Sequence, residues 1–212
     1  KVVAEIKAMG RNAIAVQADL LIEDDAHSLV VRAAEQLGGP ILCLVNNAST
    51  FEHDTISSAS RDTWDHNMGS NLRAPFILTQ AMAAQDLPES LDGEGEPIAV
   101  GLIVNMVDQR VRKLTPDFMT YTLAKMGLWA LTQTTARALA PNIRVNAIGP
   151  GPTLQNIRQS DEDFATQRSA TVLKRGANPS DITAALGYFL DAPAVTGQLL
   201  CTDGGQHLGW ET

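Results

Sequence analysis

Cysteine is scarce in this sequence, which has only Cys43 and Cys201 among its 212 residues. Each lies in an apolar run that predicts a buried strand, and no Cys-x-x-Cys pair or histidine cluster has metal-ligand spacing. We therefore expect two reduced, buried thiols in a cytoplasmic protein that holds no metal.

Basic charge is also in short supply, and long apolar runs are absent. The chain has 24 acidic and 16 basic residues, which gives a net charge of −8. An acidic surface repels nucleic-acid phosphates and anionic lipids, so we expect neither nucleic acid nor a membrane as partner. No apolar run approaches the roughly 18 residues of a spanning helix. We expect no signal peptide, because the chain opens with a polar, helix-like stretch.

Strand-type and helix-type segments alternate along the whole chain. Apolar runs predict strands at 13–17, 41–45, 98–105, 143–148 and 198–202, the second of them covered on both faces. Helical spacing predicts helices at 1–9, 23–37, 60–84 with a kink at Pro75, 118–140 and 180–190 with Ser180 or Asn178 as cap. We expect an exposed loop at 88–97 and a mobile lid at 151–173 with a short helix at 161–167.

This alternation predicts an α/β fold, in which a Rossmann-like, doubly wound parallel sheet carries helices on both faces. The length favours a single domain over residues 1–212. Such sheets bind ligands outside the carboxyl ends of their strands. We therefore expect the chemistry in the residues that follow the strands, namely Asp19, 46–51, Asp108 and 150–153.

Tyr121 and Lys125 lie four residues apart in a predicted helix, so their side chains project from one face. A phenol has an ordinary pKa of about 10 and exchanges protons poorly at neutral pH. A nearby ammonium stabilises the phenolate and lowers that pKa. The pair is a candidate acid/base group, although the same spacing also arises by chance on a solvated helix.

Six ordered motifs resemble those of the short-chain dehydrogenase/reductase family and span nearly the whole chain. Tyr121-Thr-Leu-Ala-Lys125 resembles the family's Tyr-x-x-x-Lys, and Asn46-Asn47-Ala48-Ser49 resembles its Asn-Asn-Ala-Gly. The other matches are Ala18-Asp19-Leu20, Asn71 in 71–76, 144–151, and 196–198 with 203–205. The resemblance implies an NAD(P)-dependent oxidoreductase that forms a homotetramer through the helices at 60–84 and 118–140.

The resemblance also implies roles for single residues. Asp19 would contact adenine, and the other residues that it places against the cofactor are Asn47, Ala48, Ser49, Tyr121, Lys125, Pro150 and Gly151. Lys125 would reach the ribose hydroxyls while it polarises Tyr121, and Tyr121 would donate the proton that accompanies hydride transfer. Asn71 would belong to the proton relay, although an ordinary polar residue inside a helix is the simpler alternative.

One position departs from the usual family pattern. Most members carry a serine thirteen residues before the tyrosine, where it donates a hydrogen bond to the substrate carbonyl, and this chain has Asp108 there. A carboxylate donates no hydrogen bond unless it is protonated. Asp108 therefore suits a substrate with ring nitrogens and an amino group, from which it accepts N–H bonds or to which it passes a proton. The alternative is a structural residue in an enzyme of changed activity.

Pteridine reductases share this departure, because their motif reads Asn-Met-Val-Asp before the Tyr-x-x-x-Lys pair, as Asn105-Met106-Val107-Asp108 does here. In those enzymes a Ser contacts substrate and cofactor and a Phe stacks on the pterin, and Ser49 and Phe51 occupy the matching positions. Ring stacking contributes about 0.5–1.5 kcal/mol beyond area burial. The resemblance implies reduction of a dihydropterin or dihydrofolate, with NADPH favoured over NADH. Phe51 could instead be a packed loop residue.

The family's opening strand, glycine-rich Thr-Gly-x-x-x-Gly-x-Gly turn, helix and second strand have no counterpart here. The first residues resemble the helix that follows that second strand, so about 40 residues of the usual domain are not represented. We expect the chain to be an N-terminally incomplete domain. A polypeptide that began at Lys1 would fold poorly and bind the cofactor weakly, since the glycine turn seats its pyrophosphate.

Several weaker features and two competing functions remain. We expect Arg110, Arg112, Lys113 and Arg158 to be solvated, with attraction of an acidic substrate tail or cofactor phosphate as the alternative. Trp64, Trp129 and Trp210 are expected in packing or at subunit contacts. The first alternative function is an alcohol or carbonyl dehydrogenase of the same family. The second is a non-catalytic dinucleotide-binding protein, against which the intact Tyr121 and Lys125 argue.

Overall fold

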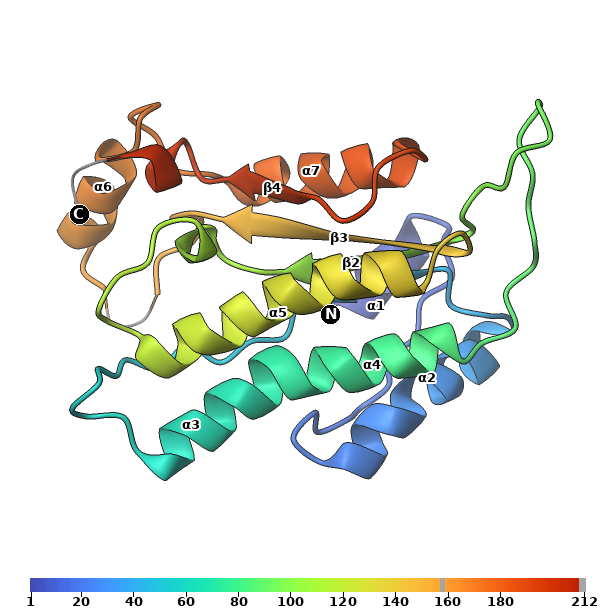
Figure 1. The fold of residues 1–212 in the computed structure, drawn as a ribbon, viewed down its shortest axis with the longest axis horizontal. Coiled ribbons are helices and arrows are strands. Elements are labelled where there is room, and N and C mark those ends of the chain that lie inside the picture. Colours follow the sequence, from blue (N-terminus) through green and yellow to red (C-terminus); the bar gives the residue numbers. More distant parts are fainter. Residues whose placement is uncertain (157–158, 210–212) are drawn as a thin grey trace.

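Four parallel strands form the centre of the molecule (Figure 1). The computed structural model describes residues 1–156 and 159–209. The strands are β1 (Cys43–Asn46), β2 (Gly101–Met106), β3 (Ile143–Pro150) and β4 (Leu199–Thr202), and they lie side by side in that order. The Rossmann-like parallel sheet expected from the sequence is confirmed.

Helices cover both faces of this sheet. The helices in the described part of the chain are α1 (Val2–Ala8), α2 (Glu23–Leu37), α3 (Arg61–Met68), α4 (Ala74–Ala83), α5 (Met119–Ala138), α6 (Asp161–Ser169) and α7 (Pro179–Asp191). Figure 1 shows α4 and α5 on one side of the sheet and α7 on the other, while α2 packs against α4. Neighbouring residues of β2 divide between the two layers, since Ile103 packs with Met82 of α4 and Leu102 packs with Phe189 of α7.

The helix predicted at 60–84 is interrupted by a π-helical segment, Gly69–Arg73, between α3 and α4. Ala74 and then Pro75 follow this segment, and Pro75 has no N–H to donate to the preceding turn. The wider turn is closed by the Ala74 N–H, which donates to the Gly69 carbonyl. Segments of this kind are often found at functional sites, and this one carries the buried side chains of Ser70 and Asn71.

Most other element predictions are confirmed within a few residues, including the protruding loop at 88–97, drawn in green in Figure 1. Asn178 is the cap of α7 and shares a capping box with Asp181. The short lid helix is α6, bounded by Asp161 and Ser169.

The strand predicted at 13–17 is wrong, because this stretch is extended but joins no ladder. A strand needs a neighbour to satisfy its N–H and C=O groups, and among the described residues only β2 pairs with β1. The edge position of β1 also corrects two further expectations. Cys43 and Val45 are exposed, so β1 is covered on one face only.

The second thiol, Cys201, is half-buried rather than buried, and both cysteines are free. Burial raises the pKa of Cys201 to about 11, so its thiol stays protonated at neutral pH. Trp129 packs beside the buried cluster around Leu128, whereas Trp64 is exposed and Trp210 lies outside the described residues. In the described ranges, no helix combines the length and apolar character needed to cross a bilayer.

Candidate active site

The carboxyl ends of the strands meet the start of α5, and a carboxyl–phenol pair lies at this junction. Asp108 follows β2 and Tyr121 lies in the first turn of α5. The Tyr121 hydroxyl donates a hydrogen bond to Asp108 Oδ2 over 2.9 Å. The other carboxylate oxygen accepts from the Arg110 N–H at 2.7 Å and begins a short 3-10 helix, Gln109–Val111. This bond fixes the Asp108 side chain towards the phenol.

Burial sets the protonation of this pair. It raises the pKa of the Asp108 carboxyl above its usual value, although the Arg110 N–H and guanidinium oppose the rise. Burial also raises the pKa of Tyr121 well above 10, and the negative charge of Asp108 is the second cause of this rise. The Arg110 guanidinium and the Ser49 hydroxyl counteract this second rise. The expectation of a lowered pKa for Tyr121 is therefore wrong, because burial and the negative charge of Asp108 outweigh the nearby positive charge. The phenol keeps its proton at neutral pH in the protein without a ligand.

Lys125 lies one helical turn after Tyr121 and is almost fully buried. Its ammonium lies 5.6 Å from the centre of the Tyr121 ring and donates to the Met106 carbonyl over 2.8 Å. Burial lowers the pKa of Lys125 to about 8, and the charge of Asp108 opposes this. Among the described residues Met106 is its only hydrogen-bond partner, which leaves two of the three ammonium donors for a ligand.

The loop after β1 is joined to the π-helical segment. Ser49 Oγ donates to Asn71 Oδ1 at 2.6 Å, and Asn71 Nδ2 donates to the Thr50 carbonyl at 3.0 Å. Asn71 is fully buried. These two hydrogen bonds attach both ends of its side-chain amide to the loop. The structure therefore places Asn71 behind the Ser49–Thr50 loop, and its contacts there are with the loop rather than with Lys125.

Two phenylalanines form an aromatic wall beside the phenol. The Phe51 and Phe118 rings are stacked with centroids 4.1 Å apart and an interplanar angle of 6°. Phe51 also meets the Tyr121 ring edge-on at 4.7 Å. The Arg110 guanidinium lies 5.1 Å from the centre of the Phe118 ring. A flat aromatic face therefore lies beside the polar Asp108–Tyr121 pair.

The Asp108–Tyr121 pair and the two phenylalanines line one cavity of about 390 Å³. Its lining residues are Phe51, Asp108, Gln109, Arg110, Phe118, Tyr121, Pro150, Gly151, Pro152, Thr153, Leu154, Asn156, Gln159, Gln167 and Gln206. The cavity thus joins residues from the carboxyl ends of β2 and β3, the start of α5 and the lid helix α6. Gly151 is needed here because a Cβ would lie 2.7 Å from Asp203 Cα, where the chain leaves β4.

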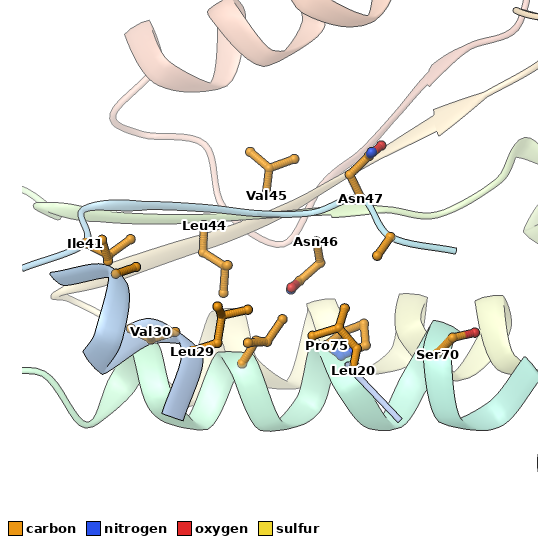
Figure 2. Close-up of a pocket in the computed structure, with 13 residues that line it drawn as sticks. Leu20, Leu29, Val30, Ile41, Leu44, Val45, Asn46, Asn47, Ser70 and Pro75 are labelled. Atoms are coloured by element: carbon orange, nitrogen blue, oxygen red, sulfur yellow. The ribbon is translucent and has the colours of Figure 1, made fainter. Parts of the chain in front are cut away.

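A second cavity of about 250 Å³ lies between α2, α4 and β1. Figure 2 shows Leu44 and Asn46 pointing from β1 towards the helices, whereas Val45 and Asn47 point to the other side. Asn47 and Ala48 line its end beside the carboxyl end of β1, together with Leu20. Leu20 follows Asp19, which is exposed in the turn before α2 and accepts from the Leu21 N–H.

The structure thus brings most of the expected site residues to one edge of the sheet. Phe51, Asp108, Tyr121, Pro150 and Gly151 share the larger cavity, and Asn47 and Ala48 line the smaller one. Asp19, Ser49, Asn71 and Lys125 line neither cavity. The sequence analysis missed Phe118 and the glutamines of the larger cavity. No sequence signal marks them, because they come to the site only when α6 and the segment before α5 are placed.

The expected basic cluster divides into separate environments. Arg110 lines the larger cavity and is half-buried, so the expectation of a solvated loop is wrong for this residue. Arg112 interacts with Cys201, and Lys113 donates to the Gly209 carbonyl. Arg158 lies outside the described residues. Across those residues, no three His, Cys, Asp or Glu side chains gather as they would around a metal ion.

Comparisons with known proteins agree on the family. The family model described as enoyl-(acyl carrier protein) reductase matches residues 1–207. The structure of FolM alternative dihydrofolate reductase 1 from Brucella canis, complexed with NADP, is 45% identical with a TM-score of 0.89, over 100% of this chain and 80% of that chain. A short-chain dehydrogenase from Burkholderia cenocepacia J2315, in complex with NADP, is 30% identical with a TM-score of 0.84. The match covers 97% of this chain and 81% of that chain.

A curated relative gives the same result. The short-chain dehydrogenase/reductase eriH of Hericium erinaceus is 32% identical over 212 residues, which cover 95% of this chain and 79% of the relative. The parallel sheet and the Tyr121–Lys125 pair on α5 agree with these matches. The chain therefore belongs to the short-chain dehydrogenase/reductase family of NAD(P)-dependent oxidoreductases.

Proposed function

We propose that this protein reduces a pterin of the dihydropterin or dihydrofolate type with NADPH. The observation that carries the proposal is the hydrogen bond of 2.9 Å between Tyr121 and Asp108 at the wall of an aromatic-sided cavity. The alternative dihydrofolate reductase from Brucella canis, 45% identical, supports the same substrate class.

The chemistry of a carboxyl group favours a nitrogen heterocycle over a ketone. When ionised, Asp108 accepts hydrogen bonds from ring N–H or amino groups, and when protonated it donates one. Burial raises the pKa of Asp108, which makes the protonated form accessible nearer to neutral pH. The stacked pair of Phe51 and Phe118 adds an aromatic wall against which a bicyclic heterocycle can pack.

The residues present fit the nicotinamide end of a cofactor. Lys125 has two free N–H donors of the kind that bind ribose hydroxyls, and it lies beside Tyr121. The other residues that would hold the cofactor are Asp19, Asn47, Ala48, Ser49, Pro150 and Gly151. NADPH supplies a hydride when it is bound. NADPH is favoured because the related structures from Brucella canis and Burkholderia cenocepacia were determined with NADP.

Tyr121 and Asp108 supply the accompanying proton. Tyr121 remains protonated at neutral pH, because burial raises its pKa, and its hydroxyl lines the cavity. It donates this proton to a substrate ring nitrogen, and a protonated Asp108 returns one to the phenolate through their hydrogen bond. Asp108 then regains a proton from solvent. Lys125 keeps positive charge near the phenolate that forms between these steps.

A carbonyl reductase is the second candidate, because relatives with that activity are also similar. A 3-oxoacyl-[acyl-carrier-protein] reductase of Staphylococcus epidermidis is 28% identical over 212 residues. An ionised Asp108 is a poor partner for a ketone oxygen, since both groups are acceptors. The Asp108 carboxyl therefore favours the pterin.

The test is turnover by the full chain, which the decrease in NADPH absorbance reports. Dihydrobiopterin, dihydromonapterin and dihydrofolate are the substrates tried. We expect oxidation of NADPH with at least one pterin, and Tyr121→Phe should lower kcat by about 100-fold or more because general acid catalysis is lost. Binding of NADPH without turnover of any pterin or carbonyl substrate would instead support a non-catalytic dinucleotide-binding protein.

We also propose that the protein acts as a homotetramer. A groove of about 670 Å³ runs between the α3–α4 helix and α5, where its lining includes Met68, Leu72, Phe76 and Leu131. Phe76 is 40% exposed, and Trp64 on the same long helix is 42% exposed. Apolar patches of this kind often mark subunit contacts.

A further inference from the structure

We propose that Asp54 is a positioning residue, whose buried carboxylate caps the start of α5 and holds Tyr121 in place through the neighbouring Thr120. The inference rests on the proposed role of Tyr121 as proton donor. Asp54 lies in the loop after β1, 66 residues before Thr120. It lines neither of the two cavities at the site, so it acts through other residues.

The N-cap residue of α5 supplies no side-chain acceptor for the first N–H groups of the helix. This residue, Phe118, has a left-handed backbone conformation with φ of 57°. The first N–H groups of a helix need acceptors from elsewhere. Asp54 supplies them, since its carbonyl accepts from the Phe118 N–H at 2.8 Å and from the Met119 N–H at 3.4 Å. Its Oδ1 accepts from the Thr120 N–H at 3.2 Å.

The Asp54 carboxylate that caps α5 is buried. Asp54 and Thr120 are each only 1% exposed, and the Thr120 hydroxyl donates to Asp54 Oδ2 over 2.5 Å. Among the described residues no Lys, Arg or His forms an ion pair with Asp54. Its negative charge is therefore stabilised by the hydrogen bonds of this turn and by the positive end of the α5 dipole.

The same loop also contacts the residues just before Thr120. Phe51 stacks on Phe118, and His53 meets that ring edge-on at 5.0 Å. His53 Nε2 also lies 3.3 Å from Asp117 Oδ1. The loop thus fixes both the aromatic wall and the backbone that carries Tyr121.

A chain of hydrogen bonds continues from this cap to the loop at the phenol. Asn67 Nδ2 donates to the Thr120 hydroxyl at 2.8 Å, and Thr50 Oγ1 donates to Asn67 Oδ1 at 3.0 Å. Asn71 Nδ2 donates to the same Thr50 hydroxyl at 3.2 Å, and Ser49 donates to Asn71. Thr120, Asn67 and Asn71 are buried, so removal of the Thr120 hydroxyl leaves Asp54 Oδ2 and Asn67 Nδ2 each without a partner.

Thr120→Val is the sharpest test, because it keeps the shape of the side chain and removes only the hydroxyl. We expect kcat for the pterin to fall between about 10-fold and about 100-fold, since a small displacement of a reacting group costs rate steeply. The KM for NADPH should stay unchanged. The solvent isotope effect on kcat should rise, because proton transfer from a displaced Tyr121 becomes slower than the other steps. Thr120→Ser restores the hydroxyl and should restore both values.

Ser60→Ala is the matched control. Ser60 Oγ caps α3 on the surface by accepting from the Thr63 N–H, and among the described residues its side chain bonds only to Thr63. It should lower the melting temperature without changing kcat or the isotope effect. If Thr120→Val and Asp54→Asn behave like Ser60→Ala, Asp54 is only a structural cap and the inference is wrong.

A second measurement needs no turnover. The chain has two tyrosines, so in a Tyr188→Phe background the phenolate absorbance reports Tyr121 alone. Thr120→Val should lower the pKa of Tyr121 towards its ordinary value, because the phenol leaves its buried place beside Asp108. An unchanged titration would contradict the inference even if the protein reduces no pterin. Equal activity of Tyr121→Phe and the unchanged protein would instead refute the proposed function.

Discussion

Asp108 is the residue at which this chain differs most usefully from a carbonyl reductase. Its side chain accepts from Tyr121 and from the Arg110 N–H, so it is fixed between the phenol and the 3-10 turn. The spacing of Asp108, Tyr121 and Lys125 could be predicted from the sequence, because a helical register places Tyr121 and Lys125 on one face. The Phe51–Phe118 stack could not, since it depends on how two loops meet.

Lys125 gives a stability prediction at the same scale. Its pKa is lowered by burial from 10.5 to about 8, so between these values the folded protein binds fewer protons than the unfolded chain. The free energy of unfolding should therefore rise with pH in this window, by about 2 kcal/mol between pH 8 and about pH 10. Denaturant unfolding across this range, compared with Lys125→Met, measures the effect. A Lys125→Met variant with the same pH slope would contradict it.

At the scale of the elements, one arginine side chain attaches α6 to the segments beside it. Arg168, at its carboxyl-terminal end, donates to the Pro152 carbonyl at 2.9 Å and to the Ala177 carbonyl at 2.6 Å. These bonds hold the helix beside the larger cavity, which Gln167 lines. The lid helix itself was predicted from the sequence, but its attachment was not, because backbone carbonyls leave no trace in a residue pattern. The strand predicted at 13–17 failed for a similar reason, since its pairing depends on neighbours.

Arg168→Ala should release α6 from the cavity. We expect the KM for the pterin to rise about 10-fold, because several charge-assisted hydrogen bonds are lost, while kcat changes less. Steady-state kinetics measures this, and hydrogen exchange of the α6 amides should become faster. The control is Arg61→Ala, which removes only an exposed pair with Asp65. An unchanged KM together with faster exchange would show that α6 is irrelevant to substrate binding.

At the scale of the whole molecule, the parallel sheet places the loops after β1, β2 and β3 at one edge, as the strand–helix alternation predicts. The sequence also predicts that helices cover both faces of the sheet. It does not show how subunits assemble, because exposed apolar residues such as Phe76 and Leu91 look alike in the sequence. Only the structure distinguishes Phe76, in a groove between two long helices, from Leu91, in a protruding loop.

Phe76→Glu should therefore break the proposed tetramer. A charge in an apolar contact loses its hydration without gaining a partner. Light scattering should show a smaller mass for this variant, whereas Leu91→Glu should keep the mass of the unchanged protein. A monomer before any substitution would contradict the tetramer.

The most direct test of the central claim is the substrate preference of Asp108→Ser. The ratio of kcat/KM for the pterin to kcat/KM for a ketone substrate should fall by about 100-fold or more. A serine hydroxyl donates a hydrogen bond to a carbonyl oxygen. It does not ionise at neutral pH, so it cannot relay a proton to the phenolate or accept N–H bonds with a full negative charge, as a carboxylate does. Tyr121 keeps its place in this variant, so ketone reduction should persist or improve. An unchanged ratio would show that Asp108 does not select the substrate and would contradict the account of this site.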